Sequence, residues 1–182
     1  MMDKLVRWLR SKKIGTTIKL QDFMAEIMGM VFMRGTLSAR VFRVNGDVED
    51  RGIISIKVVT DDFVEALVDT LQSSVAAFSD FKYHDSGEGI VGEDPTDSGL
   101  GSPCGEARDI GTQIEGATAN IYKSVATHTY AGSFSITEHG WFNSPAAGIL
   151  GDRSVFTGAN AINVSLGDRV EWTYQLTCVS GG

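Results

Sequence analysis

The chain has 182 residues, of which 42% are hydrophobic and 21% charged, and this size and composition fit one compact domain with a hydrophobic core. No apolar run approaches the roughly 18 residues of a membrane span, and the N-terminus lacks the apolar stretch and cleavage site of a secretory signal. We therefore expect a product made in the cytoplasm, with no membrane partner.

The net charge of −7 is unevenly distributed along the chain. Residues 1–13 hold five basic residues against Asp3, a net +4, which leaves −11 for the remainder. An acidic body repels polyphosphate and disfavours nucleic-acid binding.

The first segment, residues 1–18, is predicted to be a basic amphipathic arm. A helix there would carry an apolar face with basic residues around it: Leu5, Trp8 and Leu9, with Arg7 and Arg10. Such an arm suits docking to an acidic neighbour or to another subunit. A helix packed on its own domain and a frayed chain end remain open as alternatives.

A helix is predicted next over residues 19–33, from a stripe of apolar residues three and four apart: Leu20, Phe23, Met24, Ile27, Met28 and Val31. Its methionines give a soft, adaptable surface that would suit a partner interface, which makes Met24 and Met28 candidate contact residues. Methionine at helical spacing is, however, more often plain core packing.

The rest of the chain, residues 19–182, is expected to form a single β-rich domain. A strand over 36–44 is followed by Asn45-Gly46, the pair preferred in a tight hairpin, and a β-branched strand over 53–59 leads into a helix. Thr60, Asp61 and Asp62 provide the capping signal of that helix, which should end near 73–77. Its apolar residues are placed on one side: Phe63, Val64, Leu67, Val68 and Leu71.

After a short strand at 81–84, residues 85–117 are rich in glycine and polar residues and almost lack large apolar side chains. Such a segment cannot bury itself, so we expect a long surface loop that is mobile or extends over a neighbouring subunit.

The last third is predicted to be a series of strands, at 119–130, 132–142, 153–156, 161–166 and 169–179. In the last of these, alternate residues face one way: Val170, Trp172, Tyr174, Leu176 and Cys178. Residues 166–169 fit a tight turn, so we expect the last two strands to form a hairpin. The predicted fold class is mainly β with two or three helices (α+β), as an antiparallel sandwich or barrel with an N-terminal helical arm.

Tests for chemistry find no catalytic, cofactor or metal site. Residues 87–92 match G-x-G-x-x-G, but loop composition follows where a dinucleotide site needs a helix. Glu138 and His139 are adjacent on a strand and should point to opposite faces, as a surface Glu and a half-buried His. Cys104 and Cys178 lack a thiolate or metal motif, and we expect free thiols, with a disulfide as the less favoured alternative.

Several motifs after residue 80 resemble a pattern in tailed-bacteriophage virion proteins: FKYHDSG, GTQIEGATANIYKSVAT, SITEHGWFN, GILGDRSVF and VEWTYQLT. The TEHGWFN and LGDRSVF pieces are also similar to strands of phage tail-collar and fibre-attachment domains. The resemblance implies a β-rich virion structural protein and not an enzyme.

The function expected from this resemblance and from the arm, helix and loop is that of a capsid decoration (cement) subunit located in the virion. Its partners would be the major capsid protein or other virion subunits, and it would form a homo-oligomer, with a trimer as one option. The main alternative is a tail or collar adaptor or a fibre-attachment protein. A small enzyme or a carbohydrate-binding module is a more distant one.

Overall fold

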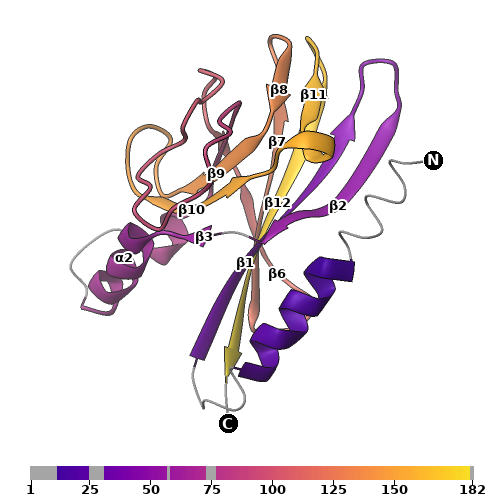
Figure 1. The fold of residues 1–182 in the computed structure, drawn as a ribbon. Helices are drawn as coiled ribbons and strands as arrows, with labels where there is room; N and C mark the ends of the chain where they lie inside the picture. The colour runs from indigo at the N-terminus through magenta and orange to yellow at the C-terminus, as the bar shows by residue number, and fades with distance from the viewer. Residues whose placement is uncertain (1–11, 25–30, 57, 73–76, 181–182) are drawn as a thin grey trace.

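The computed structural model describes residues 12–24, 31–56, 58–72 and 77–180 (Figure 1). They form a mainly β fold with two α-helices, at residues 12–24 and α2 (Asp61–Leu71), and this confirms the predicted fold class. Two short 3₁₀ helices are η1 (Phe78–Asp80) and η2 (Gly158–Asn160). The strands are β1 (Val31–Phe42), β2 (Val48–Ile56), β3 (Val58–Val59), β4 (Tyr83–Gly87), β5 (Asp109–Ile110), β6 (Thr112–Glu115), β7 (Ile121–Thr129), β8 (Phe134–Ile136), β9 (Glu138–Phe142), β10 (Leu150–Val155), β11 (Ile162–Val164) and β12 (Arg169–Ser180).

Two five-stranded antiparallel sheets form the sandwich. The first sheet has the order β2-β1-β12-β7-β6, the second has the order β3-β10-β9-β4-β5, and β11 and β8 form a separate pair. The inner faces of the two large sheets meet where Trp141 of β9 stacks on Tyr174 of β12, with ring centroids 4.2 Å apart. Buried apolar side chains from both sheets make the core on either side of this contact.

Strand β12 lies in the middle of the first sheet. It pairs along its whole length with β1, from Arg169 opposite Phe42 to Ser180 opposite Val31, and on its other side with β7. The predicted alternation of this strand is confirmed, because Val170, Trp172, Tyr174 and Leu176 are all buried in the core.

The predicted hairpin between the last two strands is wrong. A tight turn does lie there, with Gly167 at φ +85°, but β11 pairs with β8 while β12 pairs with β1 and β7. The turn therefore connects two different sheets. The Asp168 carboxylate holds this corner by accepting hydrogen bonds from Arg43 and from the backbone N–H groups of Val44 and Ser165.

The hairpin at Asn45-Gly46 and the capped helix are confirmed. Gly46 has φ +91°, but Asn45 has no positive φ and the connection spans residues 43–47, so the hairpin loop is longer than the tight turn predicted. The Thr60 hydroxyl accepts from the Phe63 N–H at the start of α2. The helix ends at Leu71, with Gln72 as its C-cap, short of the predicted end. Its apolar residues do not share one buried side: Phe63 and Ala66 face the core, and Val64, Val68 and Leu71 are exposed.

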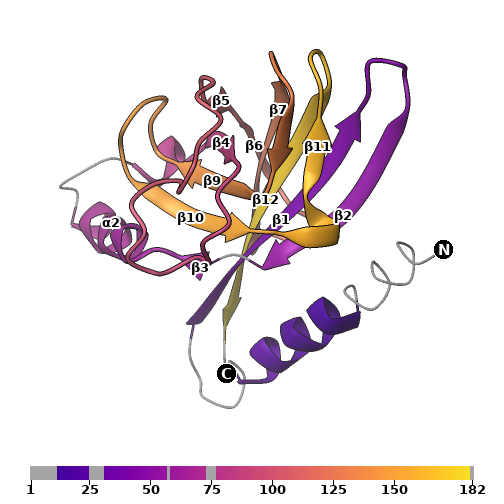
Figure 2. The same cartoon turned by 45° about the horizontal axis from the view of Figure 1, so that its top comes forward.

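The described helical residues before β1 cross a predicted boundary. They are residues 12–24, across the expected boundary at residue 18, and Val31 and Met33 belong to strand β1. A 2.5 Å contact between Asp22 and Arg34 connects this helix to β1. Figures 1 and 2 both place this helix outside the sandwich, on the side away from α2.

Three apolar side chains of this helix are half-exposed: Leu20, Phe23 and Met24. The other candidate contact residues, Leu5, Trp8, Leu9, Arg7, Arg10 and Met28, lie outside the described residues. Within the part of the chain that the structure describes, no helix is both long enough and apolar enough to cross a membrane.

Candidate functional site

The outer face of the second sheet is covered by residues 88–108, which we call the covering loop (Figure 2). Sheet register explains which side chains it covers: Gly87 lies opposite Glu138 and Asp85 opposite Gly140, so these four residues share the outer face. Residues 85–117 were predicted to be mobile or to extend over a neighbour. Instead the segment packs on its own domain and ends in the short strands β5 and β6. Polar contacts, and not an apolar core of its own, hold it there.

The Glu138 carboxylate is the main anchor of the covering loop. It is completely buried and accepts hydrogen bonds from the backbone N–H groups of Gly89, Gly101 and Ser102, at 3.0, 3.0 and 2.7 Å. A side chain at Gly89 would overlap this carboxylate, and one at Gly87 would overlap the Ser102 carbonyl. Two of the three glycines that match a nucleotide motif, Gly87 and Gly89, are therefore needed for close packing around an internal carboxylate, which also occupies the Gly89 amide group that a phosphate would use.

Arg153 compensates the buried charge of Glu138. Its guanidinium donates to Glu138 at 2.7 and 3.0 Å and to Asp97 of the covering loop at 2.8 Å. Burial by itself lowers the pKa of Arg153, but the hydrogen bonds and charges of Asp97 and Glu138 outweigh it and raise that pKa above its usual value. The charged pair thus connects β9, β10 and the loop in one network.

Arg108 fastens the far end of the covering loop. Its guanidinium lies over the Phe142 ring, 3.4 Å from the centroid, and donates to Asp85 and to the carbonyls of Ser144 and Ala147. Burial raises the pKa of Asp85, although Arg108 acts to lower it.

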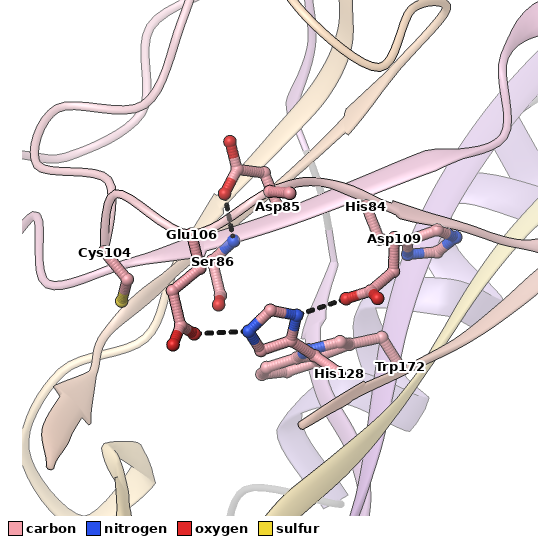
Figure 3. Close-up of a pocket in the computed structure, with 9 residues that line it drawn as sticks. His84, Asp85, Ser86, Cys104, Glu106, Asp109, His128 and Trp172 are labelled. Atoms are coloured by element: carbon pink, nitrogen blue, oxygen red, sulfur yellow. Dashed lines mark hydrogen bonds and ion pairs between the residues drawn. The ribbon is translucent and has the colours of Figure 1, made fainter. Parts of the chain in front are cut away.

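A second polar cluster surrounds His128 on β7 (Figure 3). Its Nδ1 contacts Asp109 and its Nε2 contacts Glu106, and Glu106 also accepts from the backbone N–H of Ala131. Burial lowers the pKa of His128, but the hydrogen bonds to the two carboxylates prevail and raise it above its usual value. The imidazole therefore bridges the end of the covering loop to the first sheet.

The hollow beside His128 also holds Cys104 (Figure 3). Burial and the nearby carboxylates of Glu88 and Glu106 raise the pKa of this thiol to about 12. The Cys104 thiol therefore stays protonated near neutral pH and is a poor nucleophile. Cys104 and Cys178 are both free, as predicted.

The inner face of the second sheet holds a pair of histidines. His84 Nδ1 lies 3.1 Å from His139 Nε2, and His84 Nε2 lies 2.8 Å from the Ser124 hydroxyl. A hydroxyl next to an imidazole is the arrangement of an activated nucleophile, but Ser124 and His139 are completely buried between the sheets. No substrate reaches this serine in the folded structure, and the histidines connect the two sheets.

Glu138 and His139 point to opposite faces of β9, as predicted, but their predicted exposure is wrong. Both have 0% relative exposure, because the covering loop encloses Glu138 and the first sheet encloses His139. The residues around Glu138 did not indicate its contacts, because the partners lie 36 to 49 residues away along the chain. The G-x-G-x-x-G match was the one local signal of a buried anion.

The covering loop also displays two apolar side chains that sequence reasoning missed as contact candidates. Ile90 and Val91 are 71% and 75% exposed, although they belong to a segment fixed at Gly89 and at Ser102. Among the described residues, no group of three or more His, Cys, Asp or Glu side chains is placed to hold a metal ion.

These features define an antiparallel β-sandwich whose second sheet is covered by an ion-paired loop with exposed apolar residues. Comparisons with protein-family models, with curated proteins and with solved structures found no match.

Proposed function

We propose that this chain is a structural subunit of a tailed-phage virion, and specifically a capsid decoration subunit that binds and stabilises the head lattice. Its partners are the major capsid protein or other virion subunits. The observation that carries the proposal is the covering loop: buried ionic contacts fix it in place, and it displays Ile90 and Val91 to solvent. A pre-ordered apolar surface binds with little loss of conformational entropy, which suits a permanent contact between subunits.

The half-exposed residues of helix 12–24 add a second contact surface. Leu20, Phe23 and Met24 project from an element outside the sandwich, where they do not contribute to the core of the domain. Two apolar surfaces on separate elements allow one small subunit to contact two neighbours, as a lattice requires.

The main alternative is a tail or collar adaptor or a fibre-attachment protein, which fits the same surfaces. Counting copies in purified particles by quantitative mass spectrometry separates the two. A decoration subunit is expected in a number comparable to that of the major capsid protein, whereas a tail component is expected in a few copies. A low copy number, or absence from particles, would overturn the decoration proposal.

An enzyme or a carbohydrate-binding module is the more distant alternative. It would need polar groups that converge on an accessible pocket, whereas Glu138 is buried on the outer face of β9, and His139 is buried on the inner face, as is Ser124 of β7 in the opposite sheet. We therefore propose a binding role without turnover.

A further inference from the structure

The outward face of α2 carries an apolar stripe inside an acidic frame. Val64, Val68 and Leu71, which we call the α2 stripe, follow one another at helical spacing and are 51%, 47% and 80% exposed. A surface helix of a sandwich normally turns such residues to the core, and here Phe63 and Ala66 already fill that role. The stripe is thus a second apolar face of α2, about half exposed at Val64 and Val68 and mostly exposed at Leu71.

The residues that flank the stripe on α2 are acidic. Asp61, Asp62 and Glu65 are exposed and form no ion pair with any residue that the structure describes, and α2 itself contains no Lys or Arg. The acidic surface continues onto the covering loop, because the Asp61 N–H donates to the Pro95 carbonyl and so places the exposed Asp94 nearby.

The N-terminal segment of the chain has the complementary chemistry. Residues 1–13 carry a net +4, and their sequence places Leu5, Trp8 and Leu9 on one helical face. A basic amphipathic segment matches an acid-framed apolar stripe in both its charge and its apolar contacts. Within the described part of the chain, the start of helix 12–24 lies on the side of the sandwich away from α2 in both views, which favours the α2 of a second copy as the docking partner of the segment before this helix (Figures 1 and 2).

We propose that the basic arm of one copy docks on the α2 stripe of a second copy. Such a contact uses two different surfaces of each chain. It builds a two-fold dimer where two copies exchange arms reciprocally, and a ring or an open chain of subunits where they do not. The contact deepens the oligomer part of the proposed function and rests on it. Its test uses the purified chain without particles, so a failure here and a failure of the virion role are separately visible.

The test is sedimentation velocity of the full chain over a range of concentrations and salt. The wild type is expected to associate with increasing concentration and to dissociate as salt screens the charges. The triple variants Asp61→Lys/Asp62→Lys/Glu65→Lys and Lys4→Glu/Arg7→Glu/Arg10→Glu should each weaken association by roughly tenfold or more. The combination of both triple variants should restore it, because the charges are again opposite.

Two further variants separate docking from folding defects. Val68→Ser changes an exposed side chain of the stripe and should weaken association at unchanged thermal stability. The control Asp47→Lys/Glu115→Lys reverses exposed acids on other strands and turns and should associate like the wild type. A wild type that stays monomeric at all concentrations, or association that both triple variants leave unchanged, would overturn the proposal.

Discussion

Glu138 is the residue on which the hydrogen bonds of the covering loop converge. Replacing it with Gln removes the buried carboxylate that pairs with Arg153, whose remaining carboxylate contact is Asp97, and presents an amide N–H₂ group to N–H donors. Breaking a buried charge pair in this way costs roughly 3–5 kcal/mol of unfolding free energy. We expect that loss for Glu138→Gln in urea denaturation.

Glu115 provides the matched control, because it is exposed at the edge of the first sheet and Glu115→Gln should leave the unfolding free energy unchanged. Adding Arg153→Met to Glu138→Gln should recover part of the loss, since the buried cation that has lost its Glu138 partner is then removed. A Glu138→Gln variant as stable as the wild type would contradict the anchoring role.

His128 makes the stability of the loop contact dependent on pH. The pKa of His128 is raised in the folded state, since the hydrogen bonds to Asp109 and Glu106 outweigh the effect of burial. Because the pKa of His128 is raised by folding, the charged imidazole stabilises the folded state. This stabilisation is fully present below the pKa of the unfolded chain, about 6.5, and is lost as the pH rises through the pKa of the folded state.

The comparison of wild type with His128→Gln tests this. The wild type should be the more stable of the two near pH 6, and its advantage should shrink as the pH is raised through the folded pKa, measured as the unfolding free energy at each pH. The comparison is confined to pH values above about 5, where the Asp and Glu carboxyl groups of an unfolded chain are ionised. An advantage that grows with pH would contradict the charged bridge.

At the scale of elements, Thr60 connects α2 to the second sheet. Its hydroxyl accepts from the Phe63 N–H and donates to the Leu150 carbonyl of β10. Thr60→Ala removes both bonds in a buried position, and we expect a loss of about 1–2 kcal/mol in unfolding free energy. Thr127→Ala on the exposed side of β7 is the control, for which no comparable loss is expected.

The elements that the sequence predicted are those determined by neighbouring residues. The Thr60 cap, the Asn45-Gly46 hairpin and the alternation of β12 depend on contacts within a few positions, and all three are confirmed. The prediction that the apolar residues of α2 share one side of the helix was wrong. Val64 and Val68 are apolar but exposed, and a protein surface tolerates apolar residues.

The predictions that failed depended on distant partners. The pairing of β11 with β8 and the anchoring of the covering loop on Glu138 join residues that are separated by many positions along the chain. The pair of His84 and His139 is separated by 55 residues and has no local pattern. Such contacts are decided by how the sheets close, which a single sequence does not encode in any short window.

On the scale of the whole molecule, the proposed virion role predicts that Ile90 and Val91 contact a neighbouring subunit. The variant Ile90→Ser/Val91→Ser removes two exposed apolar side chains, so binding to particles should weaken by roughly tenfold or more. The melting temperature of the free subunit should be unchanged. Co-sedimentation with particles that lack the subunit measures the binding.

Leu166 gives a matched control, since it is 70% exposed and belongs to the turn before β12, not to the covering loop. Leu166→Ser should bind particles like the wild type. Equal binding by the Ile90→Ser/Val91→Ser variant would remove the covering loop from the proposed interface.

The position of β12 has a consequence for how the chain folds. This strand follows all the other strands in sequence, yet it lies between β1 and β7 and supplies Trp172 and Tyr174 to the interior. During synthesis, one edge of β1 and one edge of β7 therefore have no hydrogen-bonding partner until β12 has left the ribosome and paired with both strands. Folding should be slow and governed by this late closure, and nascent chains stalled before residue 169 should be protease-sensitive and prone to aggregate.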